Sequence, residues 1–334
     1  MDDFNVPIAL FNFNRPQHTR SVFEIVRQIK PSRLLLVSDG PRANKPEDVH
    51  LCAEVRAIFE EIDWKCNVSR NFSDTNLGSF KRNSSGLNWV FDTVEEAIIL
   101  EDDCLPSLSF FRYCKELLER YRNDKRIGVI SGNNFVAPGA GQGDYSYFFS
   151  AYALTWGWAT WRRVWQQVDL TMSRWEEKAG KEMLRALHPQ SVEWKYWLQL
   201  YGAIHSGQRK NAWDYQLILS SFRYSQLCII PNINLISNTG YGVGATHCVD
   251  DSSRLANISR GDLEFPLIHP VSVVRCEEMD HAIFNIRILD HSTQPSLIHR
   301  AITRSQQVAI RIIASLLPET WKARIKKMME IGEN

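Results

Sequence analysis

The chain has 334 residues, of which 44% are hydrophobic and 23% are charged, and its formal net charge is +1. These values are ordinary for a globular protein with one large domain or two small ones. Nucleic-acid-binding domains are usually clearly basic, so the charge balance excludes a nucleic acid as an expected partner.

Strands and helices alternate through the first 130 residues. The buried run PIALFNF predicts a strand at residues 7–13, and apolar residues at helical spacing follow at residues 14–30. Four more strands are predicted at residues 32–40, 63–71, 96–103 and 126–132, with helices at residues 45–62, 86–94 and 107–124, the last opened by Ser107 as N-cap. This alternation predicts the α/β class, with a mainly parallel sheet flanked by helices on both faces.

Polar residues follow four of these strands, at the end where parallel sheets bind ligands. Loops are polar in general, which is the alternative reading, but carboxylates, guanidinium groups and amides at four successive strand ends favour one shared site. The residues are Asn12, Asn14, Arg15, Ser38, Asp39, Arg70, Asn71, Glu101, Asp102 and Asp103.

The second half is rich in aromatic residues and is interpreted as built onto the same sheet. Trp158, Trp161 and Trp165 have the spacing of one helical face, which indicates core packing. Trp156, in the preceding turn, is the better candidate for stacking on a sugar. Glycines at residues 240–244 suggest a mobile lid. We predict one domain at residues 1–250, with two halves at about 1–132 and about 133–250.

Residues 251–334 are predicted to form a C-terminal extension that is largely helical from about residue 295. Basic side chains at residues 322–327 are interleaved there with apolar ones, so this helix either lies on a membrane surface or packs on protein. The acidic N-terminus does not fit a signal peptide. No run approaches the roughly 20 apolar residues of a membrane span. The seven cysteines form no C-x-x-C pair. We expect a cytoplasmic protein, with peripheral contact to the inner membrane face through this helix as one option.

The consecutive carboxylates Glu101, Asp102 and Asp103 end a predicted buried strand. Crowded like charges disfavour ionisation unless a cation sits among them. Mg²⁺ and Mn²⁺ take oxygen ligands and leave positions open for phosphates, and no His or Cys stands beside the triplet to suggest zinc. A solvated acidic turn is the alternative.

The surrounding segment IILEDDCLPSLSFFRY resembles the metal-binding segment of GT-A glycosyltransferases. More narrowly, it is similar to the E-D-D-x-x-x-x-P-x-F-F pattern of N-acetylglucosaminyltransferase I and its bacterial relatives. The resemblance implies a Mn²⁺- or Mg²⁺-dependent, inverting transfer of a sugar. It also implies that residues 1–250 are the catalytic domain, with a nucleotide-sugar half at about 1–132 and an acceptor half at about 133–250. The donor would be a nucleotide-diphosphate sugar, with a UDP-sugar favoured, and the acceptor a hydroxyl of a saccharide or lipid-linked glycan. Asp103 and Glu101 would hold the metal, and Asp102 would contact the nucleotide sugar.

Other segments resemble the same family in the same order, from about residue 7 to residue 247. They imply that Asp214 of AWDYQ is the general base and that His247 of GYGVGATHC is a metal ligand or phosphate contact. The implied nucleotide-sugar contacts are Arg15 of PIALFNFNRP, Asp39 of LLLVSDG, Arg82 of RNSSGLNWVF, Trp158 of TWGWATWRRVW and Thr246 of the late loop. The chain departs from the family where W-D-D-W becomes W-D-Y-Q and where Thr246 replaces Ser.

Three alternatives stay open from the sequence. Asp214 could cap the helix that follows it instead of acting as a base. A nucleotidyltransferase could use a similar sheet, although it would usually carry a Gly-rich phosphate loop, and FNFNRPQ contains no glycine. A glycan-binding module could share the fold without catalysis, but it would have no use for a base opposite the metal.

Overall fold

The structure is a computed structural model that describes residues 4–136, 143–210, 212–241, 255 and 258–289. The predicted site residues Thr246 and His247 and the predicted helix from about residue 295 lie outside the described residues. The chain divides into two compact units, residues 1–284 and residues 285–334. The first unit thus extends past residue 250, where the predicted catalytic domain ends, and the domain assignment itself remains a prediction. Within the second unit, Asn285–Leu289 form a short π-helix.

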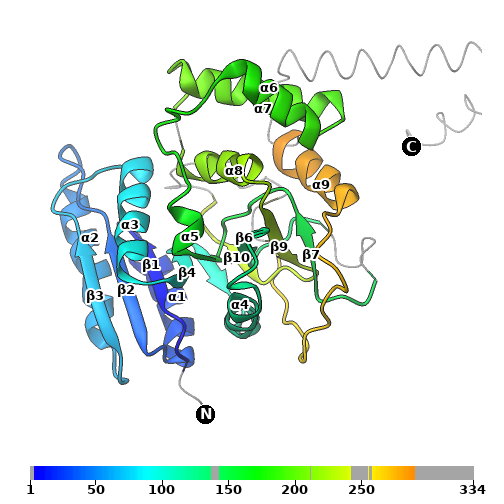
Figure 1. The fold of residues 1–334 in the computed structure, drawn as a ribbon. Coiled ribbons are helices and arrows are strands. Elements are labelled where there is room, and N and C mark those ends of the chain that lie inside the picture. Colours follow the sequence, from blue (N-terminus) through cyan, green and yellow to red (C-terminus); the bar gives the residue numbers. More distant parts are fainter. Residues whose placement is uncertain (1–3, 137–142, 211, 242–254, 256–257, 290–334) are drawn as a thin grey trace, which may run out of the picture. The chain divides into compact units, whose positions relative to one another are not determined.

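Within the described residues of the first unit, eight strands form one sheet in the order β3-β2-β1-β4-β8-β6-β9-β7 (Figure 1). Strands β1, β2, β3 and β4 pair in parallel, as do β6 and β9, whereas β8 and β7 are antiparallel to their neighbours. The strands are β1 (Ile8–Asn12), β2 (Arg33–Ser38), β3 (Asn67–Phe72), β4 (Glu96–Glu101), β6 (Ile127–Ser131), β7 (Tyr147–Ser150), β8 (Trp158–Trp161) and β9 (Leu227–Pro231).

Helices flank this sheet in two groups. Helix α1 packs beside α2 and α4, whereas α3 packs beside α5 and α8 (Figure 1). The predicted α/β class with a mainly parallel sheet is therefore confirmed. The helices of this unit are α1 (Pro16–Ile29), α2 (Glu47–Ile58) with the 3-10 turn η1 (Phe59–Glu61), α3 (Ser79–Thr93), α4 (Leu108–Tyr121), α5 (Arg162–Trp165), α6 (Glu177–Leu187), α7 (Ser191–His205), α8 (Trp213–Arg223) and α9 (Glu277–Phe284).

Local sequence explains the first elements. All five residues of β1 are buried, as expected for a strand covered on both faces. Helix α1 begins with Pro16, which fits the first helical position, and buries Val22, Phe23 and Val26 along one stripe. Helix α3 approaches the sheet closely at Gly86, where an added Cβ would lie 2.6 Å from the ring of Phe11. Only glycine fits this contact without a shift.

One local prediction was wrong, and another was confirmed in position. Trp158 and Trp161 do not share a helical face with Trp165, because they belong to strand β8, which pairs antiparallel with β4 and β6. Ser107 does occupy the N-cap position of α4, but its side chain makes no capping hydrogen bond. Its hydroxyl lies instead 2.9 Å from that of Ser109.

Strand order reverses between β1 and β4. From β1 the chain builds outward to β2 and β3 on one side, and it then returns to place β4 on the other side. Such a reversal is where open α/β sheets bind ligands, at the carboxyl ends of the strands. Phe11 at the end of β1 pairs with Glu101 at the end of β4, so the two ends lie side by side.

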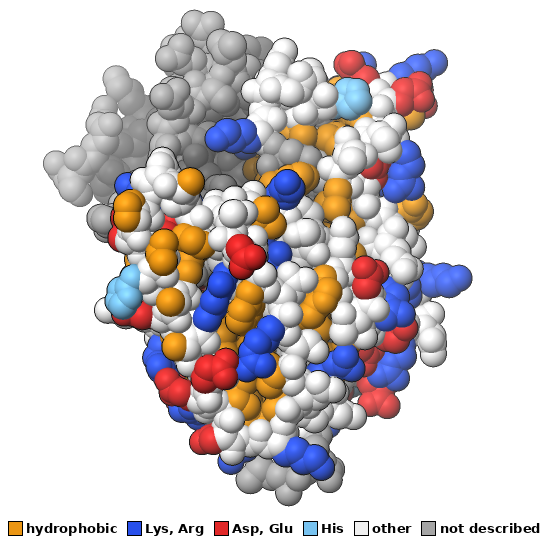
Figure 2. All heavy atoms as spheres, turned by 90° about the vertical axis from the view of Figure 1, so that its left-hand side faces the viewer, with side chains coloured by type: hydrophobic (Ala, Val, Ile, Leu, Met, Phe, Trp, Pro, Cys, Tyr) orange, Lys and Arg blue, Asp and Glu red, His pale blue; other side chains and the backbone are white. Residues whose placement is uncertain are grey.

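The small sheet of β5 (Cys104–Pro106) and β10 (Ile236–Asn238) lies directly after β4. It brings residues 236–241 back to the acidic triplet from far along the chain. Figure 2 shows the molecule from the side of β3, where basic and acidic side chains are intermixed with apolar ones. Among the described residues, no helix has the length and apolar character to cross a bilayer.

Candidate active site

Arg15 joins the ends of β1 and β4. It stands between β1 and α1, and its Nη2 donates to Asp103 Oδ2 at 2.9 Å and also to Asp102 Oδ1. Asp102 is 5% exposed and Arg15 is half-buried. The structure therefore brings together three residues that the sequence analysis predicted for one site.

The carboxylates here carry more negative charge than Arg15 offsets. Desolvation and the charges of Asp103, Asp102 and Asp214 raise the pKa of Glu101 to about 8. Desolvation also raises the pKa of Asp102 to about 6, although Arg15 opposes this shift. Like charges that crowd together in a poorly solvated place favour protonation or the arrival of a cation. We call Arg15, Glu101, Asp102, Asp103 and Asp214 the acidic site.

Asp214, from the second half of the chain, acts on this group through its charge. It is half-buried in the first turn of α8, and its charge acts on Glu101 at the end of β4. The alternative that Asp214 caps the helix is wrong, because the N-cap position belongs to Ala212. The hydroxyl of Tyr201 donates to the carbonyl of Tyr215 at 3.2 Å and so helps to fix this first turn.

Trp158 supports α8 from within the core. It is 1% exposed, and its ring stacks on that of Trp213 with 5.7 Å between the ring centroids. Trp213 directly precedes Asp214 in the helix. In this arrangement Trp158 packs against α8 and is almost fully buried. Its predicted contact with a nucleotide sugar stays a prediction.

Gly240, which follows strand β10, packs against Asp103. The amide of Thr239 donates to the Asp103 carbonyl at 2.9 Å. A Cβ added to Gly240 would lie 2.2 Å from Asp103 Oδ2. On the other side, His18 Nε2 lies 3.1 Å from the Thr239 carbonyl. The segment after β10 is thus held against Asp103 from both sides, and only glycine allows the approach.

Asp39 follows the end of β2, and Arg82, in the first turn of α3, contacts the end of β3. The carboxylate of Asp39, which is 5% exposed, accepts hydrogen bonds from the amides of Gly40, Leu77 and Gly78 at 2.9–3.1 Å. Arg82 Nη2 donates to the backbone and side-chain oxygens of Asn71 at 2.8 and 2.7 Å. Burial lowers the pKa of Arg82. Both residues therefore shape the loops after β2 and β3, and their predicted nucleotide contacts stay predictions.

The residues of the acidic site fit a divalent cation whose remaining coordination positions would be filled by a phosphate-bearing ligand and water. Among the described residues, no three His, Cys, Asp or Glu side chains form a ready metal site. Asp102 Oδ2 is nevertheless buried without a hydrogen-bond partner, and a carboxylate oxygen is the ligand that Mg²⁺ and Mn²⁺ prefer. Such ions are usually held by one or two carboxylates together with phosphate oxygens and water. Asp102 and Asp103 meet that requirement, and the predicted participation of Glu101 and His247 is not tested.

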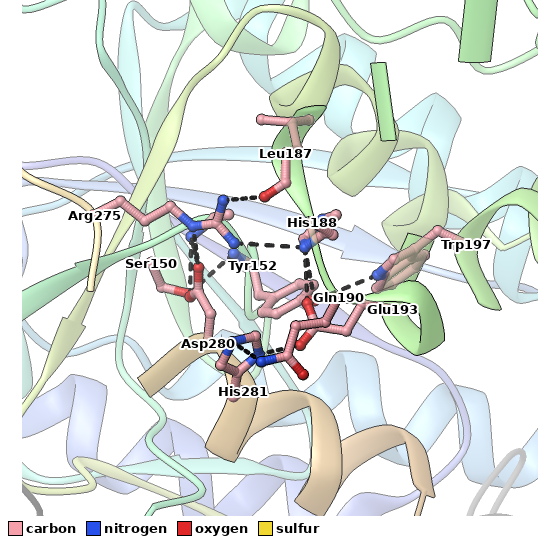
Figure 3. Close-up of polar contacts among 11 residues, drawn as sticks. Ser150, Tyr152, Leu187, His188, Gln190, Glu193, Trp197, Arg275, Asp280 and His281 are labelled. Carbon is pink, nitrogen blue, oxygen red and sulfur yellow. Dashed lines mark hydrogen bonds and ion pairs between the residues drawn. The ribbon is translucent and has the colours of Figure 1, made fainter. Parts of the chain in front are cut away.

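A second polar group, which the sequence analysis did not find, joins α7 to α9 (Figure 3). The Glu193 carboxylate lies between two histidines, with Oε2 at 2.9 Å from His188 Nδ1 and Oε1 against His281 Nδ1. The Tyr152 hydroxyl donates to Oε2 at 2.9 Å. Desolvation alone would raise the pKa of Glu193, but these hydrogen bonds outweigh it and lower the pKa below its ordinary value.

Asp280 anchors the other side of this group (Figure 3). Its fully buried carboxylate accepts hydrogen bonds from the Ser150 hydroxyl, the Ala151 amide and Arg275 Nε. Arg275 Nη1 also donates to the Leu187 carbonyl. We give the name α9 network to Ser150, Tyr152, His188, Glu193, Arg275, Asp280 and His281. Its acids have partners on all sides, so it secures α9 to the body of the protein.

No family model and no curated protein matches the chain. Solved structures similar to it include a mannosyltransferase from Pyrobaculum calidifontis in complex with GDP-mannose and Mn²⁺. The identity is 11%, the match covers 65% of this chain and 69% of that one, and the TM-score is 0.36.

Two further similar structures are a cytidylyltransferase from Leptospira borgpetersenii and a 4-diphosphocytidyl-2C-methyl-D-erythritol synthase from Anaerococcus prevotii. Each is 10% identical over 49% of this chain, which corresponds to 64% and 73% of those chains, with TM-scores of 0.32 and 0.31. Likeness this slight identifies neither an activity nor a family, so the fold class rests on the strand order itself.

Proposed function

We propose that the chain is a metal-dependent, inverting glycosyltransferase of the GT-A type, with a UDP-sugar as the favoured donor. The observation that carries the proposal is the acidic site: Arg15, Asp102 and Asp103 meet at the reversal of strand order, with the charge of Asp214 acting on Glu101 from across the chain. A phosphate-bearing ligand suits this place, because the unpartnered carboxylate oxygen can share a cation with it.

The first task of such an enzyme is to hold a sugar nucleotide by its diphosphate. Asp102 and Asp103 would hold the Mn²⁺ or Mg²⁺, which neutralises the negative charge of the leaving diphosphate. Arg15 would donate charge-assisted hydrogen bonds to phosphate oxygens. Its guanidinium is already held between two carboxylates, so little side-chain freedom is lost when phosphate binds. Asp39 and Arg82, at the next strand ends, would border the nucleoside.

The second task is to activate the acceptor. Asp214 would take the proton of an acceptor hydroxyl as general base. That oxygen then forms the new bond to the anomeric carbon, while the bond from this carbon to the diphosphate oxygen breaks. One direct displacement inverts the anomeric centre. The acceptor is a hydroxyl of a saccharide or a lipid-linked glycan.

A thermal-shift screen tests the proposal, because a ligand that binds the native state raises its apparent stability. UDP, GDP, UDP-glucose, UDP-N-acetylglucosamine and GDP-mannose would each be added with and without Mn²⁺. We expect stabilisation by at least one sugar nucleotide that depends on Mn²⁺. The absence of any Mn²⁺-dependent shift would contradict the proposal.

Product analysis separates the alternatives. A glycosyltransferase releases the nucleoside diphosphate from a sugar nucleotide, also slowly to water. A nucleotidyltransferase instead makes pyrophosphate from a nucleoside triphosphate and a sugar phosphate. A glycan-binding module produces neither. Release of UDP or GDP in the presence of Mn²⁺ therefore supports the transferase alone.

A further inference from the structure

Three half-buried aromatic side chains gather beside the acidic site. Trp156 lies 5.0 Å from Phe135 and 5.9 Å from Tyr241 between ring centroids, in edge-to-face contacts. Phe135 follows β6, Trp156 precedes β8, and Tyr241 follows β10. The three rings therefore come from separate segments, and each segment adjoins the carboxyl end of a strand or the small β5–β10 sheet.

Two glycines show how closely this cluster adjoins the acidic site. Gly240, which directly precedes Tyr241, approaches the Asp103 carboxylate so closely that a Cβ would lie 2.2 Å from it. Gly157, which follows Trp156, has a φ of +58° and would place a Cβ 3.3 Å from Leu100, the neighbour of Glu101. The cluster thus borders β4 on the side away from β1, opposite to the strand ends of Asp39 and Arg82.

Next to the backbone of Trp156, Asn133 holds an unused hydrogen-bond donor. Asn133 is 1% exposed, and its Oδ1 accepts hydrogen bonds from the Trp156 amide at 3.2 Å and the Ser131 hydroxyl at 3.1 Å. Its Nδ2 is buried without a partner. A flipped amide would turn the NH₂ group toward the Trp156 N–H, donor against donor, so the orientation is fixed.

A buried N–H without an acceptor costs free energy and is rare, so it calls for an explanation. The neighbouring Asn134 shows the usual outcome: its Nδ2 donates to the Pro231 carbonyl at 2.9 Å, and its Oδ1 accepts from the Val136 amide at 2.8 Å. The Nδ2 group of Asn134 thus has an acceptor within the protein, whereas that of Asn133 has none. An oxygen of a bound ligand would supply one.

We propose that Phe135, Trp156, Tyr241 and Asn133 form a subsite for a pyranose ring of a substrate. The apolar face of the sugar packs on the aromatic rings, which offer large apolar surfaces with little side-chain freedom to lose. A ring-substituent oxygen accepts the Asn133 Nδ2 hydrogen bond. Because Nδ2 is buried, the side chains that cover it change rotamer as the sugar enters. The inference rests on the proposed function and deepens it by naming the sugar contacts.

Both the donor and an acceptor carry a pyranose ring of this kind. The following experiment distinguishes which of the two binds at the subsite. Calorimetric titrations with Mn²⁺ would compare wild type with Asn133→Asp and Trp156→Ala. The first arm uses UDP and GDP, and the second uses UDP-glucose, UDP-N-acetylglucosamine and GDP-mannose. The third uses methyl glycosides of glucose, galactose and N-acetylglucosamine with the nucleoside diphosphate present. We expect both variants to match wild type within twofold in the first arm and to bind at least tenfold more weakly in the second or the third.

A loss in the second arm assigns the subsite to the donor sugar, and a loss in the third assigns it to the acceptor. Agreement of the variants with wild type in all arms overturns the subsite while leaving the proposed function standing. If wild type itself binds no nucleotide or sugar nucleotide with Mn²⁺, the proposed function fails and the subsite fails with it.

Two control variants separate recognition from folding. Asn134→Asp removes the hydrogen bond from Asn134 Nδ2 to the Pro231 carbonyl. It should therefore lower the melting temperature without a selective loss of sugar binding by the folded protein. Trp64→Ala removes a tryptophan whose Nε1 donates to the Pro31 carbonyl far from the site, and it should not change sugar affinity. If Asn133→Asp behaves like Asn134→Asp in both respects, the Asn133 amide is structural and the proposal is wrong.

Discussion

The acidic site and the α9 network both bury carboxylates, and Glu101 and Glu193 within them have opposite surroundings. Burial raises the pKa of Asp280 in the α9 network as well, although Arg275 and Ser150 oppose this shift. In the α9 network, Glu193 meets two histidines and a tyrosine, and its pKa falls below the ordinary value. At the acidic site, Glu101 stands among like charges, and its pKa rises to about 8. One region supplies the partners of its acids from the protein itself, and the other leaves an oxygen of Asp102 without one.

We expect this difference in the partners of the buried acids to distinguish a network that stabilises the fold from a site that binds a ligand. A network whose acids are all paired stabilises the fold, and breaking it leaves an uncompensated buried charge. A group of acids that the protein does not neutralise is costly to keep, and such groups occur where a ligand or cation completes them. The predictions below follow from the contrast: changes at the acidic site should alter activity, and changes in the α9 network should alter stability.

The largest effect is expected from Asp214→Asn. The amide cannot accept a proton from the acceptor, so transfer should fall by about 10²–10⁴-fold, the usual range for loss of a general base. Binding of the sugar nucleotide with Mn²⁺ should stay within twofold. Initial-rate kinetics and calorimetry measure the two quantities. Asp63→Asn, at an acid whose side chain is 70% exposed, is the matched control. Normal transfer by the Asp214 variant would remove this residue from the mechanism.

Asp103→Asn should abolish the Mn²⁺-dependent part of donor binding, because the charge that attracts the cation and holds Arg15 is reduced. We expect affinity for the sugar nucleotide to fall by about 100-fold with Mn²⁺ and to change little without it. Titration with and without EDTA measures this. An equal loss under both conditions would mean that Asp103 acts through the fold and not through a cation.

Glu193→Gln should destabilise the protein by about 1–3 kcal/mol at pH 7, because the amide NH₂ group cannot accept the hydrogen bonds that a buried carboxylate oxygen of Glu193 accepts. The pKa of Glu193 is lowered in the folded state, so its contribution is fully present above the ordinary value of 4.5 and is lost as pH falls through the lower folded value. The gap between variant and wild type should therefore narrow below about pH 4.5. Urea unfolding at several pH values measures it, with the exposed Glu182→Gln as control. A gap that does not change with pH would contradict the role given to the carboxylate.

The smallest effects come from a pair of glycine substitutions. Gly240→Ala would push a methyl group into the Asp103 carboxylate and should weaken Mn²⁺-dependent donor binding by about tenfold, which corresponds to about 1.4 kcal/mol. Gly202→Ala, inside α7 with nothing within 4 Å of its added Cβ, should leave binding unchanged and raise stability by about 0.5–1 kcal/mol. Equal donor affinity in the two variants would show that the close approach to Asp103 has no functional role.

Much of the first half of the fold was predictable from local pattern. The apolar spacing of α1 and the continuous apolar runs of β1, β2 and β4 need no distant partner to be recognised. The acidic triplet could be placed at a strand end for the same reason. Neither β7 nor α9 was predicted, and β8 was taken for a helix, because these elements depend on pairing with strands or helices far along the chain.

By itself the sequence determined that carboxylates and an arginine would stand at the ends of buried parallel strands, because period and composition act over a few neighbouring residues. Only the tertiary structure decided that the charge of Asp214 in α8 acts on Glu101 and that Gly240 meets Asp103. It also decided that hydrogen bonds stabilise the charged form of Glu193, whereas burial and like charges destabilise that of Glu101. The charge state of a carboxylate depends on its surroundings in space, and those surroundings come from segments that no local pattern connects.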